Sequence, residues 1–528
     1  MSPDTLHEPE EAHEPPGAET PKKAALASPE GKGGRGPPAG SALRAGRWLR
    51  LTGGNIVASK SEAKLFGDVQ KHSSTTKSQV KRLVAKARIA QAVYESFSQE
   101  QVDAIVKGIG KYVYDNAEIL ARMAVDETGI GVYEDKVLKK KGKARAIWNN
   151  LKNKKSRGII GEKPESNMVL VAKPMGVVGA VTPVTNPIVT PMCNAMFALK
   201  TGNAVIFAPH PKAERCTQHL TDAFMEIVKA NGGPDDLIQM VKNGSVETTQ
   251  ELMKDVDVVV ATGGGAMVRS AYSSGKPSYG VGAGNVPVII DRDVDLKDAT
   301  EKIVTGASFD NGIICSHEQF VLTPEERYDE TIKSFIATGR VWFTDDKEQV
   351  QKLREIIFHD GHLNKDVVGR SPREIGAQAG LDVPETARII LLPAEGAGTE
   401  DILAKEKLCP VVAILPYRTF EQAVAAAKAN LLVEGAGHSA ALHSNNEANI
   451  RFTGVELPIS RLVINQSSSL TAGGSLTNGF APTTTLGCGS WGGNSISENL
   501  DYKHLMNVSR IGKVIADKKV PTDAEIWA

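Results

Sequence analysis

The chain has 528 residues, of which 41% are hydrophobic, and equal numbers of basic and acidic residues give a formal net charge of zero. Its length predicts about three domains, and the balanced charge argues against a general attraction to nucleic acid or membranes. No apolar run approaches the roughly 18 residues of a membrane span. Five cysteines without a CxxC pair argue against a disulfide framework or a zinc site. We therefore expect a soluble cytoplasmic protein with neither a nucleic-acid nor a membrane partner.

The first part of the chain, residues 1–78, is expected to be a disordered extension. Residues 1–42 are dominated by Pro, Gly, Ala, Glu and Lys, so they cannot bury enough apolar surface to offset the entropy lost on ordering. Residues 44–51 then combine three arginines with Trp48 and two leucines. This short segment is a candidate amphipathic docking peptide, although a tether with no binding role is equally compatible with it.

Helical structure is predicted from about Gln79. Apolar residues recur there at spacings of three and four, which is typical of an amphipathic helix. Further helices are expected up to residue 128, separated by Ser, Asp and Asn start signals. Residues 136–157 are strongly basic, and we interpret them mainly as a solvated helix face.

From Met168 onward β-rich and helical segments alternate, which predicts βαβ units and parallel sheets. A first alternation ends near residue 285 and a second follows Pro287, so two α/β domains are expected. The predicted strands are residues 168–173, 177–182, 204–208, 237–241, 257–262, 286–290, 319–323, 388–393 and 411–415.

Cys315 is the candidate nucleophile. The β-branched residues Ile313 and Ile314 deliver it onto a small polar turn, and such a stem fixes the backbone while polar neighbours keep the sulfur hydrated. The alternative is a buried structural cysteine, which is the commoner fate of a lone thiol.

Three loops could serve a reaction at this thiol. Residues 261–266 form a glycine turn between a strand and a helix, where backbone N–H groups can approach a phosphate. Residues 280–287 form a narrow glycine segment that could lie against a flat cofactor ring or simply link two domains. In the proline-stiffened loop 182–187, Thr185 and Asn186 offer neutral donors to a developing oxyanion. Plain turns remain the alternative for the first and third loops.

Together these segments resemble the aldehyde dehydrogenase superfamily from about Gln79 to the C-terminus. Cys315 matches the family's nucleophile, and Glu406 in the segment 406–411 matches the residue that binds the nicotinamide ribose. Residues 262–264 are similar to the cofactor turn, and residues 182–187 to the loop near the nicotinamide and the oxyanion. The implied catalytic residues are Cys315, Asn186 and Thr185, and the implied cofactor contacts are Thr182, Pro183, His210, Gly263, Gly264, Gly282 and Glu406.

The resemblance also implies a domain organisation. A Rossmann-type cofactor domain is expected at residues 79–285, an α/β catalytic domain at 286–497, and oligomerisation elements at the hairpin 162–175 and the segment 498–528. A homodimer or homotetramer would follow. The expected cofactor is NAD, and no metal is expected.

One departure from the family pattern narrows the reaction. Hydrolytic members carry a glutamate that activates water, and alignment on Pro287 puts Val281 at that position. Valine cannot accept a proton, so the chain resembles instead the CoA-acylating branch, the acetaldehyde and propionaldehyde dehydrogenases. Residues 208–211 also replace a lysine-containing segment of hydrolytic members, which leaves His210 as a possible contact for either nucleotide.

The resemblance implies reversible oxidation of propanal or ethanal to the acyl-CoA, with coenzyme A as a substrate. Members of this branch often work inside bacterial microcompartments, so residues 44–51 could bind a shell protein. Two alternatives stay open. Water could be activated by Glu406 or His438 in a hydrolytic enzyme, or the fold could serve as a scaffold without turnover.

Overall fold

The computed structural model describes residues 60–528, with side chains from residue 76 onward. Helix α1 spans Lys60–Tyr94, so helical structure begins before Gln79 and includes residues 60–78. This corrects the expectation that the whole of 1–78 lacks structure, while the candidate docking peptide 44–51 lies outside the described residues. No helix in the described part is long and apolar enough to cross a membrane.

Among the residues from 60 onward, four helices precede the first strands: α1, α2 (Gln99–Asp115), α3 (Ala117–Thr128) and α4 (Tyr133–Leu151). Helix α2 begins at a capping box in which the Ser98 hydroxyl accepts from the Gln101 backbone and the Gln101 side chain accepts from the Ser98 backbone. Its face built from Ile105, Ile109 and Val113 is fully buried, and each such side chain contributes about 1.5–3 kcal/mol to folding. Helix α2 packs on α4 and on α5 (Val189–Lys200).

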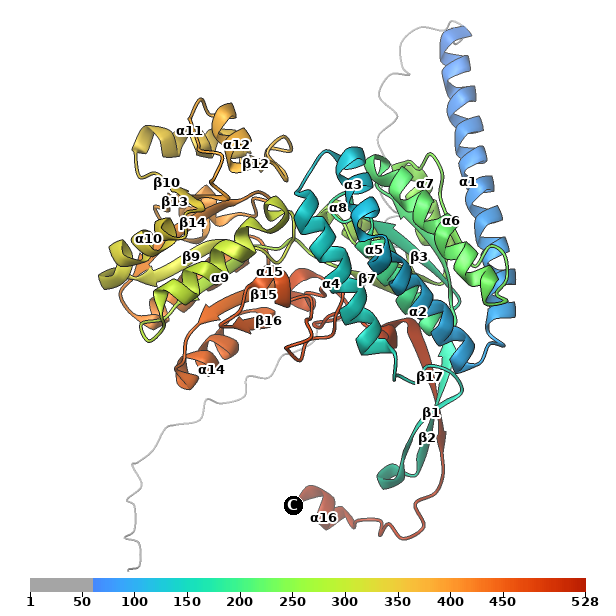
Figure 1. Cartoon of the computed structure of the whole chain (residues 1–528). Coiled ribbons are helices and arrows are strands. Elements are labelled where there is room, and N and C mark those ends of the chain that lie inside the picture. Colours follow the sequence, from blue (N-terminus) through green and yellow to red (C-terminus); the bar gives the residue numbers. More distant parts are fainter. Residues whose placement is uncertain (1–59) are drawn as a thin grey trace, which may run out of the picture. The chain divides into compact units, whose positions relative to one another are not determined.

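The first large sheet has five parallel strands in the order β5-β4-β3-β6-β7 (Figure 1). The order reverses between β3 and β6, and such a switch point is where open α/β sheets bind ligands at the carboxyl ends of their strands. The strands are β3 (Val177–Thr182), β4 (Ala204–Pro209), β5 (Ile238–Met240), β6 (Val258–Ala261) and β7 (Ser278–Gly280), and the helices are α5 (Val189–Lys200), α6 (Glu214–Ala230), α7 (Val246–Asp255) and α8 (Gly265–Tyr272).

The second large sheet has seven parallel strands in the order β10-β13-β14-β9-β8-β15-β16. Cys315 lies in the connection between α9 and β9, so a central strand fixes one end of its turn. The strands are β8 (Val286–Ile290), β9 (Glu318–Pro324), β10 (Val341–Phe343), β13 (Ile389–Pro393), β14 (Val411–Tyr417), β15 (Gly437–His443) and β16 (Ile459–Ile464). The helices are α9 (Leu296–Ser308), α10 (Tyr328–Ala337), α11 (Lys347–Ile357), α12 (Pro372–Gln378), α13 (Phe420–Val433), α14 (Glu447–Glu456) and α15 (Ser468–Thr471), and β11 (Phe358–His359) pairs with β12 (His362–Leu363).

A third, antiparallel sheet joins the hairpin β1 (Ile159–Lys163) and β2 (Met168–Pro174) to β17 (Met506–Gly512). Strand β17 pairs with β2 along its whole length, from Met506 opposite Pro174 to Gly512 opposite Met168. The two segments expected to mediate oligomerisation therefore lie in one sheet, which carries the C-terminal helix α16 (Asp523–Trp527) (Figure 1).

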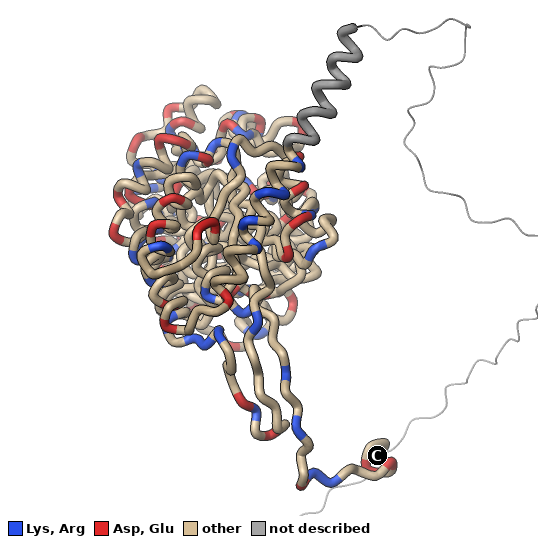
Figure 2. The backbone as a smooth tube through the Cα atoms, turned by 90° about the vertical axis from the view of Figure 1, so that its right-hand side faces the viewer, with Lys and Arg blue, Asp and Glu red and all other residues tan. Residues whose placement is uncertain are grey.

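The basic helix α4 is not the solvated face that its composition suggested. Lys136 is only 2% exposed and Lys140 only 3%, because both stand on the side of α4 that faces the protein interior. Elsewhere basic and acidic positions are interspersed along the described backbone (Figure 2), in agreement with the zero net charge.

Candidate active site

Cys315 opens into a cavity of about 400 Å³ that lies between α4, the loop after β3 and the segment 469–486. The lining is mostly apolar, with a few polar groups from elements far apart in the sequence, as is usual for a small-molecule site. Its polar lining includes Lys139, Lys143, Asn186, Cys315, Ser469 and Thr484.

The turn that presents Cys315 is held in an unusual backbone conformation. Asp310, Asn311 and Gly312 have φ values of 54°, 52° and 67°, all in the left-handed region, which costs free energy for residues other than glycine. A side chain on Gly312 would also meet the backbone of Cys409 at 2.8 Å. Strain of this kind persists only where the surroundings over-determine it.

The carboxylate of Asp310 supplies that support. Its Oδ1 accepts from the backbone N–H of Val132 at 2.8 Å, and its Oδ2 accepts from Lys136 Nζ at 3.1 Å and Lys139 Nζ at 2.5 Å. Burial alone would raise the pKa of Asp310, but the two ammonium groups hold that pKa below its ordinary value. The cysteine turn is thereby fastened to α4 by a buried charge cluster.

The glycine segment 280–287 and the glutamate segment 406–411 meet beside Cys315. The backbone N–H of Gly284 donates to Glu406 Oε1 at 2.9 Å, while the side-chain amide of Gln319 donates to Gly284 O at 2.9 Å and accepts from Lys407 N at 2.7 Å. A Cβ on Gly284 would come within 1.7 Å of the Cys315 carbonyl oxygen. Glycine is therefore required here for close approach, and Gln319, which the sequence reasoning did not single out, holds the three segments together.

The Cys315 thiol is protonated at neutral pH in this structure. Burial raises the pKa of Cys315 to about 12, with smaller raising contributions from the nearby carboxylate of Glu406 and the thiol of Cys488 and a lowering contribution from Arg461. Burial together with Glu434 also raises the pKa of Glu406 to about 8. Cys315 must therefore lose its proton as it reacts, and Glu406 is uncharged over much of the neutral range.

The structure distinguishes the two candidate oxyanion donors. Asn186 lines the cavity, whereas Thr185 lies in a smaller crevice beside Lys136 and Lys140. Lys139 Nζ donates to Asn186 Oδ1 at 2.9 Å, which assigns the oxygen of the amide to the lysine. The Nδ2 group is left with one weak contact of 3.4 Å, to Thr185 Oγ1, so it is free to donate to a substrate oxygen.

The candidate cofactor residues converge on the carboxyl edge of the five-stranded sheet. The backbone N–H of His210 donates to Thr182 O, and that of Thr262 donates to Val181 O, both at 3.0 Å. Gly264 precedes α8 without a side-chain cap, nothing lies within 4 Å of a Cβ at that position, and the buried Thr182 hydroxyl has no partner among the described residues. Open N–H groups at a helix start and an unpaired hydroxyl at a switch point fit a dinucleotide. Pro183 follows Thr182 on the same edge.

No general base for hydrolysis stands where the family resemblance would put one. Val281 is 4% exposed and packs with Val463, Ala472, Leu486 and Cys488, in a setting where a carboxylate would be left unpaired. The described residues that line the cavity include neither Asp nor Glu.

Two histidines near these segments are buried. His317, two residues after Cys315, is fully buried, and burial lowers its pKa to about 4. His438, the alternative base for hydrolysis, is also fully buried, its ring nitrogens lack partners among the described residues, and burial holds its pKa well below the ordinary value. Neither histidine lines the cavity.

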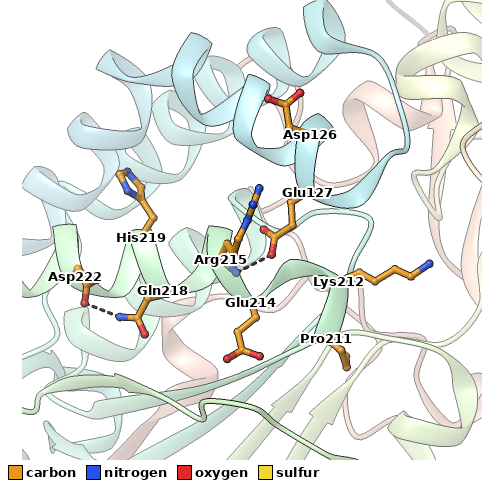
Figure 3. Close-up of a pocket in the computed structure, with 9 residues that line it drawn as sticks. All are labelled: Asp126, Glu127, Pro211, Lys212, Glu214, Arg215, Gln218, His219 and Asp222. Atoms are coloured by element: carbon orange, nitrogen blue, oxygen red, sulfur yellow. Dashed lines mark hydrogen bonds between the residues drawn. The ribbon is translucent and has the colours of Figure 1, made fainter.

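A second hollow lies on the surface between α3 and α6 (Figure 3). Its Glu127 carboxylate accepts from the backbone N–H groups of Arg215 and Cys216, each at 2.7 Å, so it caps the start of α6. His210 lies beside this hollow, and its Nδ1 accepts from Lys212 N at 3.1 Å. The described residues that line this hollow include no Cys, Ser or Thr, and its Glu127 stabilises the start of α6.

The role of the lysines on α4 is not apparent from the sequence alone. Lys136, Lys139, Lys140 and Lys143 stand at spacings of three and four, which places them on one face of a helix. That spacing was the available signal, but a charged face is usually solvated, and only the position of Asp310 turns this face inward.

Comparison with known proteins agrees with the geometry. Residues 57–351 match the aldehyde dehydrogenase family. The succinate-semialdehyde dehydrogenase (acetylating) of Clostridium kluyveri is 54% identical over 448 residues, which cover 85% of this chain and 98% of that protein.

Solved structures agree as well. An acetylating aldehyde dehydrogenase from Geobacillus thermoglucosidasius is 34% identical with a TM-score of 0.81, over 85% of this chain and 99% of that one. A propionaldehyde dehydrogenase from Rhodopseudomonas palustris, solved with bound CoA and an acylated cysteine, is 28% identical with a TM-score of 0.73, over 82% and 97%. The expected fold class and enzyme class are confirmed: the chain belongs to the aldehyde dehydrogenase family, and within it to the CoA-acylating aldehyde dehydrogenases.

Proposed function

We propose that this chain oxidises a short-chain aldehyde with NAD and transfers the acyl group from Cys315 to coenzyme A. The observation that carries the proposal is the cavity itself: one thiol and one oriented amide face it, and its lining has no carboxylate to activate water. The acylated cysteine and bound CoA of the Rhodopseudomonas palustris enzyme support the same chemistry.

The chain's own residues would act in order. Deprotonated Cys315 attacks the aldehyde carbon, and Asn186 Nδ2 donates to the oxygen as negative charge develops there. Loss of hydride from the carbon leaves an acyl thioester on Cys315, and the CoA thiol then takes the acyl group. A thiol has a pKa of about 8.5 and ionises far more readily than water, so Val281 can stand where hydrolysis would need a base. Transfer of the acyl group from Cys315 to CoA exchanges one thioester for another, so the energy that hydrolysis would release is kept and the reaction is reversible.

The nicotinamide cofactor, when bound, accepts the hydride. Thr182, Pro183, Gly263 and Gly264 would hold it at the edge of the five-stranded sheet, together with His210. Gly282 and Glu406 would meet its nicotinamide end, since the segment that contains Gly282 connects this edge to Cys315. The preference for NAD over NADP stays a prediction.

A product analysis tests the proposal and its rivals. The purified enzyme is incubated with propanal, ethanal or butanal and NAD, with and without CoA, and both reduced cofactor and acyl products are measured. We expect acyl-CoA in proportion to reduced cofactor, and little turnover without CoA. Equal turnover without CoA would support a hydrolytic enzyme, and a parent protein that shows no more turnover than its Cys315→Ala variant would support a scaffold.

We also propose that the chain forms a homodimer or homotetramer through the sheet β1-β2-β17 and the segment after it. Apolar side chains are exposed there: Ile159 is 57% exposed, Ile511 50%, Val514 85% and Trp527 84%. Light scattering of the full chain and of a chain ending at residue 505 tests this proposal by measuring the number of chains per particle. The same number for both proteins would contradict it. Packaging inside a microcompartment through residues 44–51 stays a separate prediction, tested by co-purification with a shell protein after deletion of residues 1–59.

A further inference from the structure

One side chain of the active-site cavity has no part in the chemistry proposed above. Lys143 lines the cavity with Cys315, and its Nζ donates to Gly473 O at 2.7 Å and to Thr483 O at 3.0 Å. This position of the ammonium group requires a glycine at residue 473, because a Cβ on Gly473 would lie 2.6 Å from Nζ. An ammonium has three N–H donors, so one remains for a ligand.

The charge of Lys143 is not balanced by the protein. Among the described residues no carboxylate lies within 4.0 Å of its Nζ, and the one carboxylate that pairs with this face of α4, Asp310, already serves both Lys136 and Lys139. Burial lowers the pKa of Lys143 to about 8, so its charged form is less favourable here than in water. Charges buried without a partner are costly, and an incoming anion would relieve that cost.

Two hydroxyl groups add to the polar lining. Ser469 is 6% exposed, and both Ser469 Oγ and Thr484 Oγ1 are buried without a hydrogen-bond partner among the described residues. Both residues line the cavity. An unpaired ammonium donor with two unpaired hydroxyls is the donor set that a carboxylate binds, whereas an alkyl chain would leave all three unsatisfied.

We propose that Lys143, supported by Ser469 and Thr484, binds a carboxylate at the far end of the substrate, so that the aldehyde is a short semialdehyde acid rather than propanal or ethanal. The inference rests on the proposed function and deepens it by naming the substrate class and a residue that selects it. The Clostridium kluyveri relative is by its name an enzyme of this substrate class, but the assignment to Lys143 comes from the cavity.

Two aldehydes with the same carbon skeleton test the assignment. Succinic semialdehyde ends in a carboxylate and butanal in a methyl group, and kcat/KM for each is measured with saturating NAD and CoA. In the Lys143→Met and Lys143→Gln variants we expect kcat/KM for the semialdehyde to fall about 10- to 100-fold, the usual value of a hydrogen bond to a charged group, while butanal is used as well as before or better. Lys143→Gln keeps N–H donors for the two carbonyl groups and so separates charge from packing.

Lys141→Met is the matched control, because Lys141 lies on the same helix, pairs with Glu118 and does not line the cavity. This variant should retain the parent's preference. Equal losses for both aldehydes in the Lys143 variants would make Lys143 a structural residue and overturn the inference, as would a parent enzyme that prefers butanal.

A binding measurement separates this inference from the reaction. Succinate is added while Cys315 is alkylated with iodoacetamide, without cofactor or CoA. We expect succinate to slow alkylation of the parent and of Lys141→Met but not of Lys143→Met. Failure of acyl-CoA formation with every aldehyde would overturn the proposed function alone, whereas absence of succinate protection in the parent would overturn the inference alone.

Discussion

Gly284 and Cys315 touch through their backbones, although 31 positions separate them in the sequence. A Cβ added to Gly284 would come within 1.7 Å of the Cys315 carbonyl oxygen, and the N–H of the same glycine donates to Glu406. The nucleophile, the glycine segment and the glutamate segment therefore form one rigid unit. This contact explains why a residue without chemistry of its own is needed at position 284.

We expect Gly284→Ala to displace the Cys315 turn and abolish most activity. The added methyl group meets backbone atoms that cannot rotate away, and overpacking of this kind costs about 1–3 kcal/mol. Thermal unfolding and the rate of reduced-cofactor formation measure the two effects. Gly282→Ala is the control for stability, because its Cβ would make only ordinary contacts, with Cys488 Sγ at 3.6 Å and Gly492 O at 4.0 Å. Equal melting temperatures for the two variants would contradict the argument.

Asn186→Ala should lower kcat about 100- to 1000-fold, the usual effect of removing an oxyanion donor. Thr185→Ala should cause a much smaller loss, since Thr185 does not line the cavity. Steady-state rates with a saturating aldehyde make the comparison. The opposite order would assign the oxyanion to Thr185, and equal small losses would point to backbone donors.

Glu406→Gln should make Cys315 more reactive toward iodoacetamide above pH 8. Ionised Glu406 raises the pKa of Cys315, and glutamine removes this charge while keeping an oxygen for Gly284 N–H. Ionisation of Glu406 itself occurs near its raised pKa of about 8, so the two proteins should differ little at pH 6 and diverge as the pH rises. Peptide mapping assigns the modified thiol, and identical rates at pH 9 would contradict the prediction.

Asp310→Asn should destabilise the protein by about 3–5 kcal/mol, because it leaves Lys136 and Lys139 as buried cations without a partner. Urea unfolding measures this loss. Asp298→Asn is the control, since Asp298 pairs with Lys302 on the surface, and such exposed pairs contribute about 0–1 kcal/mol. Similar losses in the two variants would show that the Asp310 cluster does not support the fold.

The same cluster sets a direction for acid sensitivity. The pKa of Asp310 in the folded protein is lower than its ordinary value, so its contribution is complete above the ordinary carboxylate pKa and is lost as the pH falls through the lowered one. The stability difference between the parent and Asp310→Asn should therefore shrink in acid. A difference that grows on acidification would reverse the sign and refute the assignment.

Much of the fold can be read from local patterns. Alternating apolar strands and helices predict two parallel sheets because each βαβ unit buries its strand on both faces. In the structure, the strands of the first sheet end by Gly280 in the sequence and those of the second begin at Val286. Cys315 and Glu406 could be singled out because their segments combine residue types that resemble a known family. The replacement of a carboxylate by Val281 is likewise visible without coordinates, since it depends on residue identity alone.

Long-range contacts could not be predicted in this way. The sequence predicts a solvated basic face on α4 because lysines are rarely buried, and only tertiary structure brings Asp310 to Lys136 and Lys139. The same packing decides which of two adjacent donors faces the substrate, because Lys139 reaches Asn186. The same packing places Lys143 in the cavity. The helical period puts four lysines on one face of α4, but the partners Asp310, Gly473 and Thr483 lie more than 150 positions away in the sequence.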